Sequence, residues 1–383
     1  RFMQICPATA SVQSATIRRS AGGVAQIEHI PNLLRLNSLF DLRIVADPSD
    51  LARKFVTGRF GVACVSDASD LLAMPLDAVV IASPDPLHFA QVSAALSAGL
   101  HVFCEKPLCY AASDVAELGR QRDAAGRVLQ VGYMKRFDPS YEALLALLPA
   151  QEGALRHVAV EVTDPDAAPF IRHHDFKMAT DLPSSARETL MAEQARQVAR
   201  AVQVPLDEMS YRGFCGAYAS SIVHDVNAVH GILYRLGTRI DGIVAAALFA
   251  DGFGGQGAVS LDGGAALWTM SHLTVPQLPH YSERITLTFA GSSLELEFPS
   301  PWLNHAPTRL TQRRGRGLAL ETTEIRTGYA EAFVEQLAGF HRAVTQNEPV
   351  RNTAEQAAND MSLLAGLATW HATHIAGTKG IGR

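Results

Sequence analysis

Two stretches of the chain decide its fold: residues 77–88 read Asp-Ala-Val-Val-Ile-Ala-Ser-Pro-Asp-Pro-Leu-His, and residues 99–108 read Gly-Leu-His-Val-Phe-Cys-Glu-Lys-Pro-Leu. Each contains a nearly continuous apolar run, which predicts a strand covered on both faces. Pro84 and Pro86 break the chain after the first run, and the residues that follow have helical spacing and close with Gly99. A strand, a helix and a second strand in this order predict a βαβ unit of a parallel sheet.

The same alternation continues on both sides of this unit. Residues 41–47 predict a strand that ends in an acid, residues 112–124 a helix, and residues 128–133 a further strand. Beyond Phe137, strand-like segments between residues 240 and 298 are separated by glycine-rich turns, which is typical of a mostly antiparallel sheet. We therefore expect the α/β class, with an N-terminal Rossmann-type doubly wound parallel sheet and a C-terminal α+β domain built on a large, mostly antiparallel open sheet.

A chain of 383 residues is too long for one ordinary core, so we expect two domains. We assign residues 1–16 to a loose extension, residues 17–137 to a dinucleotide-binding Rossmann domain, and residues 138–383 to a substrate-binding and oligomerisation domain. Its final helices, expected within residues 329–373, could pack back on the first domain. The polar stretch of residues 164–209 fits neither pattern and suggests a lid or an oligomer contact.

Composition narrows the class of protein further. Hydrophobic residues make up 48% and charged residues 19%, and a net charge of −5 gives no broad reason to bind nucleic acid or an anionic membrane. Five scattered cysteines argue against a disulfide framework and fit a reducing compartment. No apolar run reaches the ~18 residues of a membrane-spanning helix, and residues 1–16 lack the apolar centre of a secretory signal. We therefore expect a cytoplasmic protein.

A glycine-containing turn at residues 20–25 precedes a helix that we expect to open near Gln26. It partly fits the dinucleotide pattern G-x-G-x-x-G/A, but Ser20 stands where the first glycine belongs, and the strand before it, residues 17–19, carries two arginines. Backbone amides at such a turn and the start of its helix can approach a pyrophosphate. Taken alone, the pattern leaves open an ordinary loop or a cofactor-binding turn formed by Gly22, Gly23, Val24 and Ala25.

Asp47 strengthens the cofactor interpretation. It ends a predicted strand 27 positions after Ser20, where an acid would accept hydrogen bonds from the adenosine ribose hydroxyls. An acid there repels a 2′-phosphate, so NAD is favoured and NADP is less favoured. The alternative is that Asp47, which precedes Pro48, only caps the next helix.

The two stretches quoted above resemble the Gfo/Idh/MocA family of sugar and polyol oxidoreductases. The likeness extends through residues 131–139 and back to residues 25–31, so it covers the first domain except for its first strand. It implies an NAD(P)-dependent dehydrogenase or reductase, with NAD(H) favoured, that oxidises or reduces a secondary hydroxyl or ketone of a sugar, glycoside or cyclitol. The resemblance also implies which residues of the second half of this domain lie at the cofactor: Ser83, Pro84, His88, Glu105 and Lys106.

Two residues are candidates for proton handling. Lys106 follows the carboxyl end of a strand, where its ammonium can hydrogen-bond a substrate hydroxyl and stabilise alkoxide charge; the alternative is a surface Glu–Lys pair. Residues 216–227 resemble the family helix with an Asp-x-x-x-His pattern, and His224 matches the histidine as a general acid/base. Ser220 stands where the aspartate belongs, so Lys106, Asp225 or Tyr133 would have to compensate.

The resemblance supplies further candidates for substrate binding: Tyr133, Arg136 and Asn227, together with His224. An ion pair at the domain junction is the alternative for Arg136, and a core or cap role is the alternative for His224. We assign no metal, because the consecutive residues 173–175 (His-His-Asp) do not share one face of a helix or strand. We interpret the arginine-rich residues 311–316 as an exposed loop between strands.

Two other functional classes remain open at this point. Relatives that hold NAD transiently to eliminate or hydrolyse a glycosidic bond suggest an NAD-assisted lyase or hydrolase, for which NADH would not accumulate. Ser20, Arg18, Arg19 and Ser220 suggest a catalytically inactive nucleotide-binding regulator. In each case we expect a small polyhydroxylated ligand, no nucleic acid or membrane partner, and a homodimer or homotetramer.

Overall fold

The computed structural model describes residues 2–5, 21–151, 153–165 and 168–375. The chain divides into two compact units, neither of which is continuous in sequence. The first unit comprises Arg1–Tyr133, Ile171–Ala201 and Phe333–Met361, and the second comprises Met134–Phe170, Val202–Ala332 and Ser362–Arg383. These bounds differ from the continuous domains 17–137 and 138–383, because a mid-chain segment and a late helix join the first unit.

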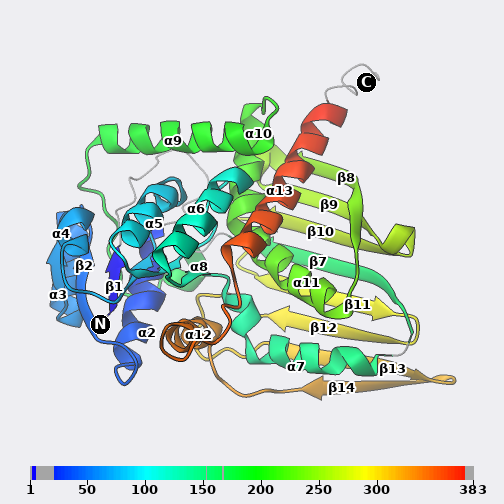
Figure 1. The fold of residues 1–383 in the computed structure, drawn as a ribbon. Coiled ribbons are helices and arrows are strands. Elements are labelled where there is room, and N and C mark those ends of the chain that lie inside the picture. The colour runs from blue at the N-terminus through cyan, green and yellow to red at the C-terminus, as the bar shows by residue number, and fades with distance from the viewer. Residues whose placement is uncertain (1, 6–20, 152, 166–167, 376–383) are drawn as a thin grey trace. The chain divides into compact units, whose positions relative to one another are not determined.

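The first unit is built on a six-stranded sheet with the strand order β3-β2-β1-β4-β5-β6. Figure 1 labels β1 and β2 of this sheet, in blue. All its neighbouring strands are parallel. This order is that of the doubly wound dinucleotide-binding fold. The strands are β1 (Phe2–Ile5), β2 (Leu42–Ala46), β3 (Ala63–Val65), β4 (Ala78–Ile81), β5 (His101–Cys104) and β6 (Leu129–Val131).

The first strand corrects one expectation. Phe2–Ile5 pairs with both β2 and β4 in the middle of the sheet, so residues 1–16 are not wholly a loose extension. The expected strand at residues 17–19 lies outside the described residues. The physical reason is visible in the sequence: Phe-Met-Gln-Ile is apolar enough for a central strand, whereas two arginines in such a strand would bury charge.

Helices cover the parallel sheet. The first of them begins at Ala21 rather than near Gln26, so Gly22 and Gly23 lie in its first turn. The helices of this unit are α1 (Ala21–Val24), the π-helical η1 (Ala25–His29), α2 (Ile30–Arg35), α3 (Asp50–Phe60), α4 (Ala68–Leu72), η2 (Asp85–Leu87), α5 (His88–Ser97), α6 (Ala112–Ala125), α9 (Ser184–Val202), α12 (Ala332–Gln346) and the beginning of α13 (Ala354–Ile375).

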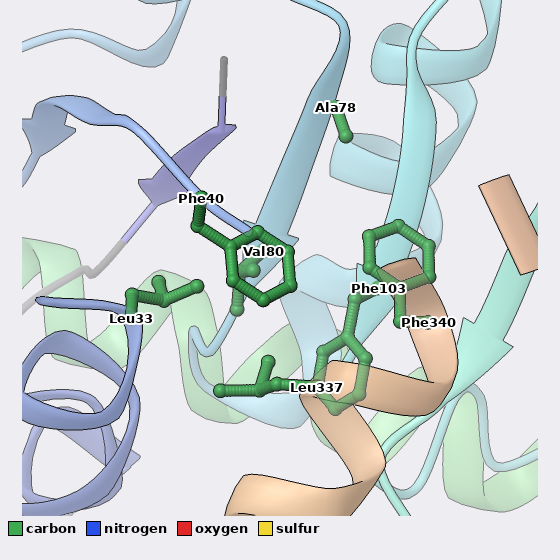
Figure 2. Packing of buried hydrophobic residues seen from close by; sticks show 7 residues of the cluster. All are labelled: Leu33, Phe40, Ala78, Val80, Phe103, Leu337 and Phe340. Atoms are coloured by element: carbon green, nitrogen blue, oxygen red, sulfur yellow. The ribbon is translucent and has the colours of Figure 1, made fainter. Parts of the chain in front are cut away.

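A buried cluster joins the beginning and the end of this unit's sequence (Figure 2). Phe103 of β5 meets Phe340 of α12 edge to face, with ring centroids 5.8 Å apart. Helix α12 therefore closes one face of the sheet that α2 also covers. The members of the cluster are Leu33, Phe40, Ala78, Val80, Phe103, Leu337 and Phe340.

The second unit is built on an eight-stranded sheet with the order β14-β13-β12-β11-β7-β10-β9-β8. Its pairs are antiparallel except β7–β10, which is parallel. Burial alternates along β10, β11 and β12, so one face of the sheet is covered and the other is open. The strands are β7 (Leu155–Asp164), β8 (Ile240–Phe249), β9 (Gly254–Leu261), β10 (Ala266–Thr274), β11 (Ser282–Phe289), β12 (Ser292–Phe298), β13 (Arg309–Arg316) and β14 (Ala319–Ile325).

The covered face carries the helices of this unit, among which η5 packs on β9 and β10, and α7 packs on β12 and β13. No helix in the described ranges is both long enough and apolar enough to cross a bilayer. The helices are η3 (Met134–Phe137), α7 (Pro139–Leu147), η4 (Leu148–Ala150), α8 (Ala168–Ile171), α10 (Glu208–Gly213), the π-helical η5 (Phe214–Ile222), α11 (Val223–Leu236), the short turns η6 (Ala250–Gly252) and η7 (Asp262–Gly264), and the end of α13.

The arginine-rich residues 311–316 are not a loop, and that expectation was wrong. They belong to β13, which pairs with β12 on one side and β14 on the other. Arg309 forms an ion pair with Glu297, and Arg313 pairs with Glu295 at 3.3 Å. Opposite charges on neighbouring strands thus stabilise a segment whose own sequence reads as polar.

Candidate functional site

One imidazole joins the loops that follow β4 and β5. His88 is fully buried, with Nδ1 2.7 Å from the carbonyl oxygen of Pro107 and Nε2 2.9 Å from that of Ser83. The Lys106–Pro107 peptide bond, in the loop that follows β5, is cis. His88 therefore fixes the backbone at the carboxyl edge of the parallel sheet, where open α/β sheets bind ligands. The cofactor role expected for His88 stays a prediction.

Glu105 is held next to Lys106 by a second buried histidine. The Oε1 atom of Glu105 lies 2.8 Å from Nε2 of His29, and Oε2 accepts the Lys106 backbone N–H at 3.2 Å. Burial alone would raise the pKa of Glu105, but the His29 hydrogen bond and the charges of His29 and Lys106 outweigh burial and hold that pKa below its ordinary value. Glu105 is therefore a buried carboxylate that anchors the backbone carrying Lys106.

The end of β6 completes this side of the edge. A Cβ atom at Gly132 would lie 2.9 Å from Oε1 of Glu105 and 3.2 Å from its Cα, so only glycine leaves room for Glu105. Tyr133 is fully buried, and its carbonyl accepts a 2.7 Å hydrogen bond from Nδ2 of Asn352. The carbonyl of Asn352 in turn accepts the Val131 N–H at 3.0 Å, so Asn352 fixes the backbone at Tyr133.

Three features of this unit fit a dinucleotide. Asp47 is buried at the end of β2, and its Oδ1 accepts the Ser49 N–H at 2.8 Å. Ser49 is itself the N-cap of α3, so Asp47 is not the capping residue. The Ser83 hydroxyl is buried and has no hydrogen-bond partner among the described residues, a group that a bound ligand would satisfy. The first helix begins at a segment containing Gly22 and Gly23, and glycine adds no side chain of its own between the backbone and a pyrophosphate.

In the second unit, the helix that carries His224 is not one regular α-helix. Its π-helical part, η5, ends at Ile222 and passes directly into α11, and such π-helical turns occur frequently at functional sites. Ser220 and His224 are half-buried, whereas Ala219 and Asp225 are buried. The two candidate positions therefore lie on the less buried side of this helix.

Asp225 does not simply replace the missing aspartate, because it belongs to a buried charged cluster. Nζ of Lys135 donates to Oδ1 of Asp225 at 2.5 Å and also to Oε1 of Glu283. The Tyr281 hydroxyl donates to the other oxygen of Glu283 at 2.7 Å. Burial and the nearby charge of Glu283 raise the pKa of Asp225 to about 8, even though Lys135 opposes that shift. One lysine thus faces two carboxyl groups, of which Asp225 keeps its proton to near neutral pH.

Arg136 is bound to the helix that carries His224. Its Nε and Nη2 atoms donate to the carbonyl of Asn227 at 2.9 and 2.7 Å. Tyr141 donates to the carbonyl of Ala228 at 2.9 Å, and Gly231 leaves room for both side chains. Arg136 therefore clamps α11, and the substrate roles of Arg136 and Asn227 stay predictions.

The candidates fall into two groups, each described within its own unit. Sequence reasoning missed the supporting residues: His29 and Lys135 lay inside residues 25–31 and 131–139, which carry the family likeness, but received no role, and no local pattern marks Glu283. Burial raises the pKa of the Cys104 and Cys109 thiols, so both behave as small apolar side chains. No group of three metal-ligating side chains occurs within the described part of the chain. The first unit holds Ser83, Pro84, His88, Glu105, Lys106 and Tyr133, and the second holds Arg136, His224 and Asn227.

Part of the chain is similar in sequence to curated proteins. A curated inositol 2-dehydrogenase of Acidothermus cellulolyticus is 38% identical over 140 residues, 36% of this chain and 40% of that protein. Inositol 2-dehydrogenase 1 of Saccharopolyspora erythraea is 45% identical over 87 residues, 22% and 26% of the two chains. The matched part thus spans less than half the length of these relatives.

Solved structures cover nearly the whole chain at low identity and therefore show the fold alone. The 3-ketoreductase KijD10 of Actinomadura kijaniata, solved with NADP and TDP-benzene, has a TM-score of 0.68 at 18% identity and covers 97% of each chain. The UDP-N-acetylglucosamine 3-dehydrogenase GnnA of Acidithiobacillus ferrooxidans has a TM-score of 0.63 at 18% identity and covers 97% of this chain and 98% of its own. Residues 21–133 match the model of the Gfo/Idh/MocA family, described as an oxidoreductase family with an NAD-binding Rossmann fold.

Proposed function

We propose that this protein is an NAD(H)-dependent oxidoreductase that interconverts a secondary hydroxyl and a ketone on a sugar, glycoside or cyclitol. The observation that carries the proposal is Lys106, placed after β5 on a backbone that Glu105 and His88 hold from two sides. A cation fixed at the carboxyl edge of a dinucleotide-type sheet is suited to binding a substrate oxygen beside a nicotinamide. The names of the curated relatives make inositols the first substrates to test.

The chain's residues divide the work in this proposal. Gly22, Gly23, Val24 and Ala25, with Asp47 and the Ser83–Pro84 loop, hold the dinucleotide, and bound NAD⁺ supplies the hydride acceptor. Lys106 hydrogen-bonds the substrate hydroxyl through Nζ and stabilises the alkoxide charge that develops on its oxygen. His224 takes the hydroxyl proton on an imidazole nitrogen and returns it in the reverse direction. Tyr133, Arg136 and Asn227 are the proposed hydrogen-bonding residues for a polyhydroxylated substrate.

Binding and turnover test the proposal in sequence. Calorimetric titration of the purified chain should show micromolar binding of NAD⁺ and NADH and weaker binding of NADP⁺ and NADPH. Absorbance at 340 nm should then rise with an inositol or sugar in the presence of NAD⁺. Failure of every dinucleotide to bind would overturn the proposal, and product formation without net NADH would assign an NAD-assisted lyase or hydrolase instead.

A variant of Lys106 tests the residue that carries the argument. Lys106→Met should lower kcat by a factor of about 100 or more, because it removes the cation that stabilises the alkoxide, while NAD⁺ binding changes little. Lys54→Met, on the exposed side of α3, is the matched control and should keep wild-type kcat. Equal kcat for the wild type and Lys106→Met would remove Lys106 from the mechanism.

We also propose a cytoplasmic homodimer or homotetramer. The open face of the second sheet supports the assembly, because outward positions along β10 are uncharged: Leu267, Thr269, Ser271 and Leu273. Four cysteines of the described chain, Cys64, Cys104, Cys109 and Cys215, are free thiols, which fits a reducing compartment. Light scattering coupled to size exclusion should give two or four times the chain mass of 41.2 kDa, and a monomer would contradict the assembly.

A further inference from the structure

A segment from the middle of the chain runs along the nucleotide edge of the first unit. We call this segment, Ile171–Ala201, the strap. It ends in helix α9, and it is tied by hydrogen bonds to the first helix and to the loops after β2, β4 and β5. The pairs are Lys177 with Gln26, Asp181 with Ser49, Gln197 with the carbonyl of Pro86, and Gln194 with Tyr110. The strap therefore reaches the strand ends at which a dinucleotide binds.

Asp181 of the strap makes a specific contact at the start of α3. The Ser49 hydroxyl donates to its Oδ1 at 2.5 Å, and the Leu51 N–H donates to its Oδ2 at 3.2 Å. Ser49 is the N-cap of this eleven-residue helix. The first amides of a helix have no partner within the helix and favour an anion, and here the Asp181 carboxylate supplies that anion.

The same helix start adjoins the acid expected to bind the adenosine ribose. Asp47 ends β2, and its carboxylate accepts the N–H of Ser49, the residue that also holds Asp181. A 2′-phosphate on that ribose would need donors beside Asp47. The hydroxyl of Ser49 and the amide of Leu51 are the donors at this place, and both already bind the Asp181 carboxylate.

We propose, building on the function proposed above, that Asp181 is a specificity-determining residue that excludes NADP by occupying, as a built-in anion, the place at the start of α3 that a 2′-phosphate would need. Asp47 selects the ribose hydroxyls, and Asp181 takes the neighbouring donors. Two carboxylates then face any phosphate brought to this ribose, and like charges at short range repel it. The discriminating group thus comes from the strap, outside the segment that carries the family match.

The surrounding charges agree with exclusion of a phosphate. The hydrogen bond from the Ser49 hydroxyl lowers the pKa of Asp181, burial opposes this effect, and the hydrogen bond from the Leu51 amide lowers the pKa further. The net result is a pKa below the ordinary value, so the Asp181 carboxylate is charged at neutral pH. Arg53, on the same turn of α3, is directed elsewhere: Nη1 donates to the carbonyls of Asp47 and Pro48 at 2.7 and 2.9 Å, and Nη2 to Asp50 at 3.3 Å. The local cation therefore binds backbone and carboxylate oxygens.

Two variants separate the loss of charge from the release of donors. Asp181→Asn removes the charge and keeps one carbonyl oxygen, which can accept from the Ser49 hydroxyl or from the Leu51 amide in place of the two carboxylate oxygens. Asp181→Ala leaves both donors without this acceptor. Asp175→Asn is the control, because Asp175 is another exposed acid on the strap whose ion-pair partner is Arg59, at 4.0 Å. The ligands are NAD⁺, NADP⁺ and the fragments adenosine 5′-monophosphate and adenosine 2′,5′-bisphosphate, titrated by calorimetry into the full chain.

The expected result is a change in NADP⁺ affinity alone. The wild type should bind NAD⁺ at least about 100-fold more tightly than NADP⁺. Asp181→Ala should bind NADP⁺ at least about tenfold more tightly than the wild type does. The affinity of this variant for NAD⁺ should differ from that of the wild type by less than about threefold. Asp181→Asn should give a smaller gain in NADP⁺ affinity, and Asp175→Asn should give none. The affinity for adenosine 2′,5′-bisphosphate should change across the variants in the same way as the affinity for NADP⁺.

Three results would overturn the assignment. Wild-type binding of NADP⁺ as tight as that of NAD⁺ would remove the selectivity to be explained. Unchanged NADP⁺ affinity in both Asp181 variants, with NAD⁺ binding intact, would refute the role of Asp181 and leave the proposed function standing. Failure of the wild type to bind any dinucleotide would overturn the proposed function, and the assignment of Asp181 with it.

Discussion

Replacement of Lys135 by methionine would remove the only cation of a buried three-residue cluster while keeping most of the side-chain volume. Lys135, Asp225 and Glu283 have side chains exposed by 4%, 0% and 6%. Removal of one member of a buried ion pair is strongly destabilising, because the partner is left as an uncompensated charge. Without Lys135 both carboxyl groups must be neutral in the folded chain.

The structure sets the size of this loss. Asp225 already holds its proton to about pH 8, so its neutral form costs little at pH 7. Removal of one partner of a buried ion pair costs about 3–5 kcal/mol, and this cost falls as the pH is lowered, because protonation removes the uncompensated charge. We therefore expect Lys135→Met to lower the free energy of unfolding by about 4 kcal/mol at pH 7 and by much less at pH 5.

Urea unfolding followed by tryptophan fluorescence measures this change in the unit that contains the cluster. All three tryptophans of the chain, Trp268, Trp302 and Trp370, belong to the second unit, as the cluster does. Lys54→Met is the control: Lys54 pairs with Asp50 at 2.7 Å but is 75% exposed, so its loss should cost about 0.5 kcal/mol or less. A loss below about 1 kcal/mol for Lys135→Met at pH 7, or an equal loss at pH 5, would refute the reasoning.

Three further predictions follow from single contacts. We expect the stability of the wild type to decline as pH rises from about 4 to 8, by up to about 1.4 kcal/mol per pH unit from Asp225, because the raised pKa of this group makes its ionisation unfavourable to folding. Asp225→Asn should flatten this decline, which urea unfolding at several pH values measures. Gly132→Ala should cost about 1–3 kcal/mol in the same assay, since its Cβ would lie 2.9 Å from Glu105, and an unchanged midpoint would contradict that crowding. His88→Ala should weaken NAD⁺ binding about tenfold in calorimetry by releasing the carbonyl of Pro107, and wild-type affinity would show that the loop holds without it.

The parts of the fold that the sequence predicted are those whose order is local. Strands β4 and β5 are continuous apolar runs between chain-breaking residues, and β8 (Ile240–Phe249) begins where the strand-like segments of residues 240–298 were expected to begin. The strand β13 escaped prediction because its stability depends on its neighbours. Arg309 and Arg313 pair with glutamates on β12, and Arg316 pairs with Glu321 on β14. No pattern within residues 309–316 reveals these relationships.

The candidate site divides in the same way. Lys106 and His224 were recognisable from short patterns, since each has its family-like neighbours within a few positions. His29 pairs with Glu105 across 76 positions, and Lys135 with Glu283 across 148. Pairings over such separations leave no periodic signal in a single sequence, because any buried acid could meet any buried base. The strap was unplaced for the same reason: its polar contacts form only with loops far away in the sequence.

The two candidate proton-handling residues share one structural arrangement, which explains why the supporting residues are charged. Lys106 is half-buried and directly follows Glu105, which is bound to His29; His224 is half-buried and directly precedes Asp225, which is bound to Lys135. Adjacent residues on a strand end or a helix point in different directions, so the buried carboxyl group can hold the backbone while its neighbour stays accessible. An apolar side chain at these anchor positions would bury area but would not fix the backbone through directed hydrogen bonds. The buried polar anchors are therefore better explained by positioning than by stability alone, since a buried ion pair contributes little net stability compared with well-packed apolar residues.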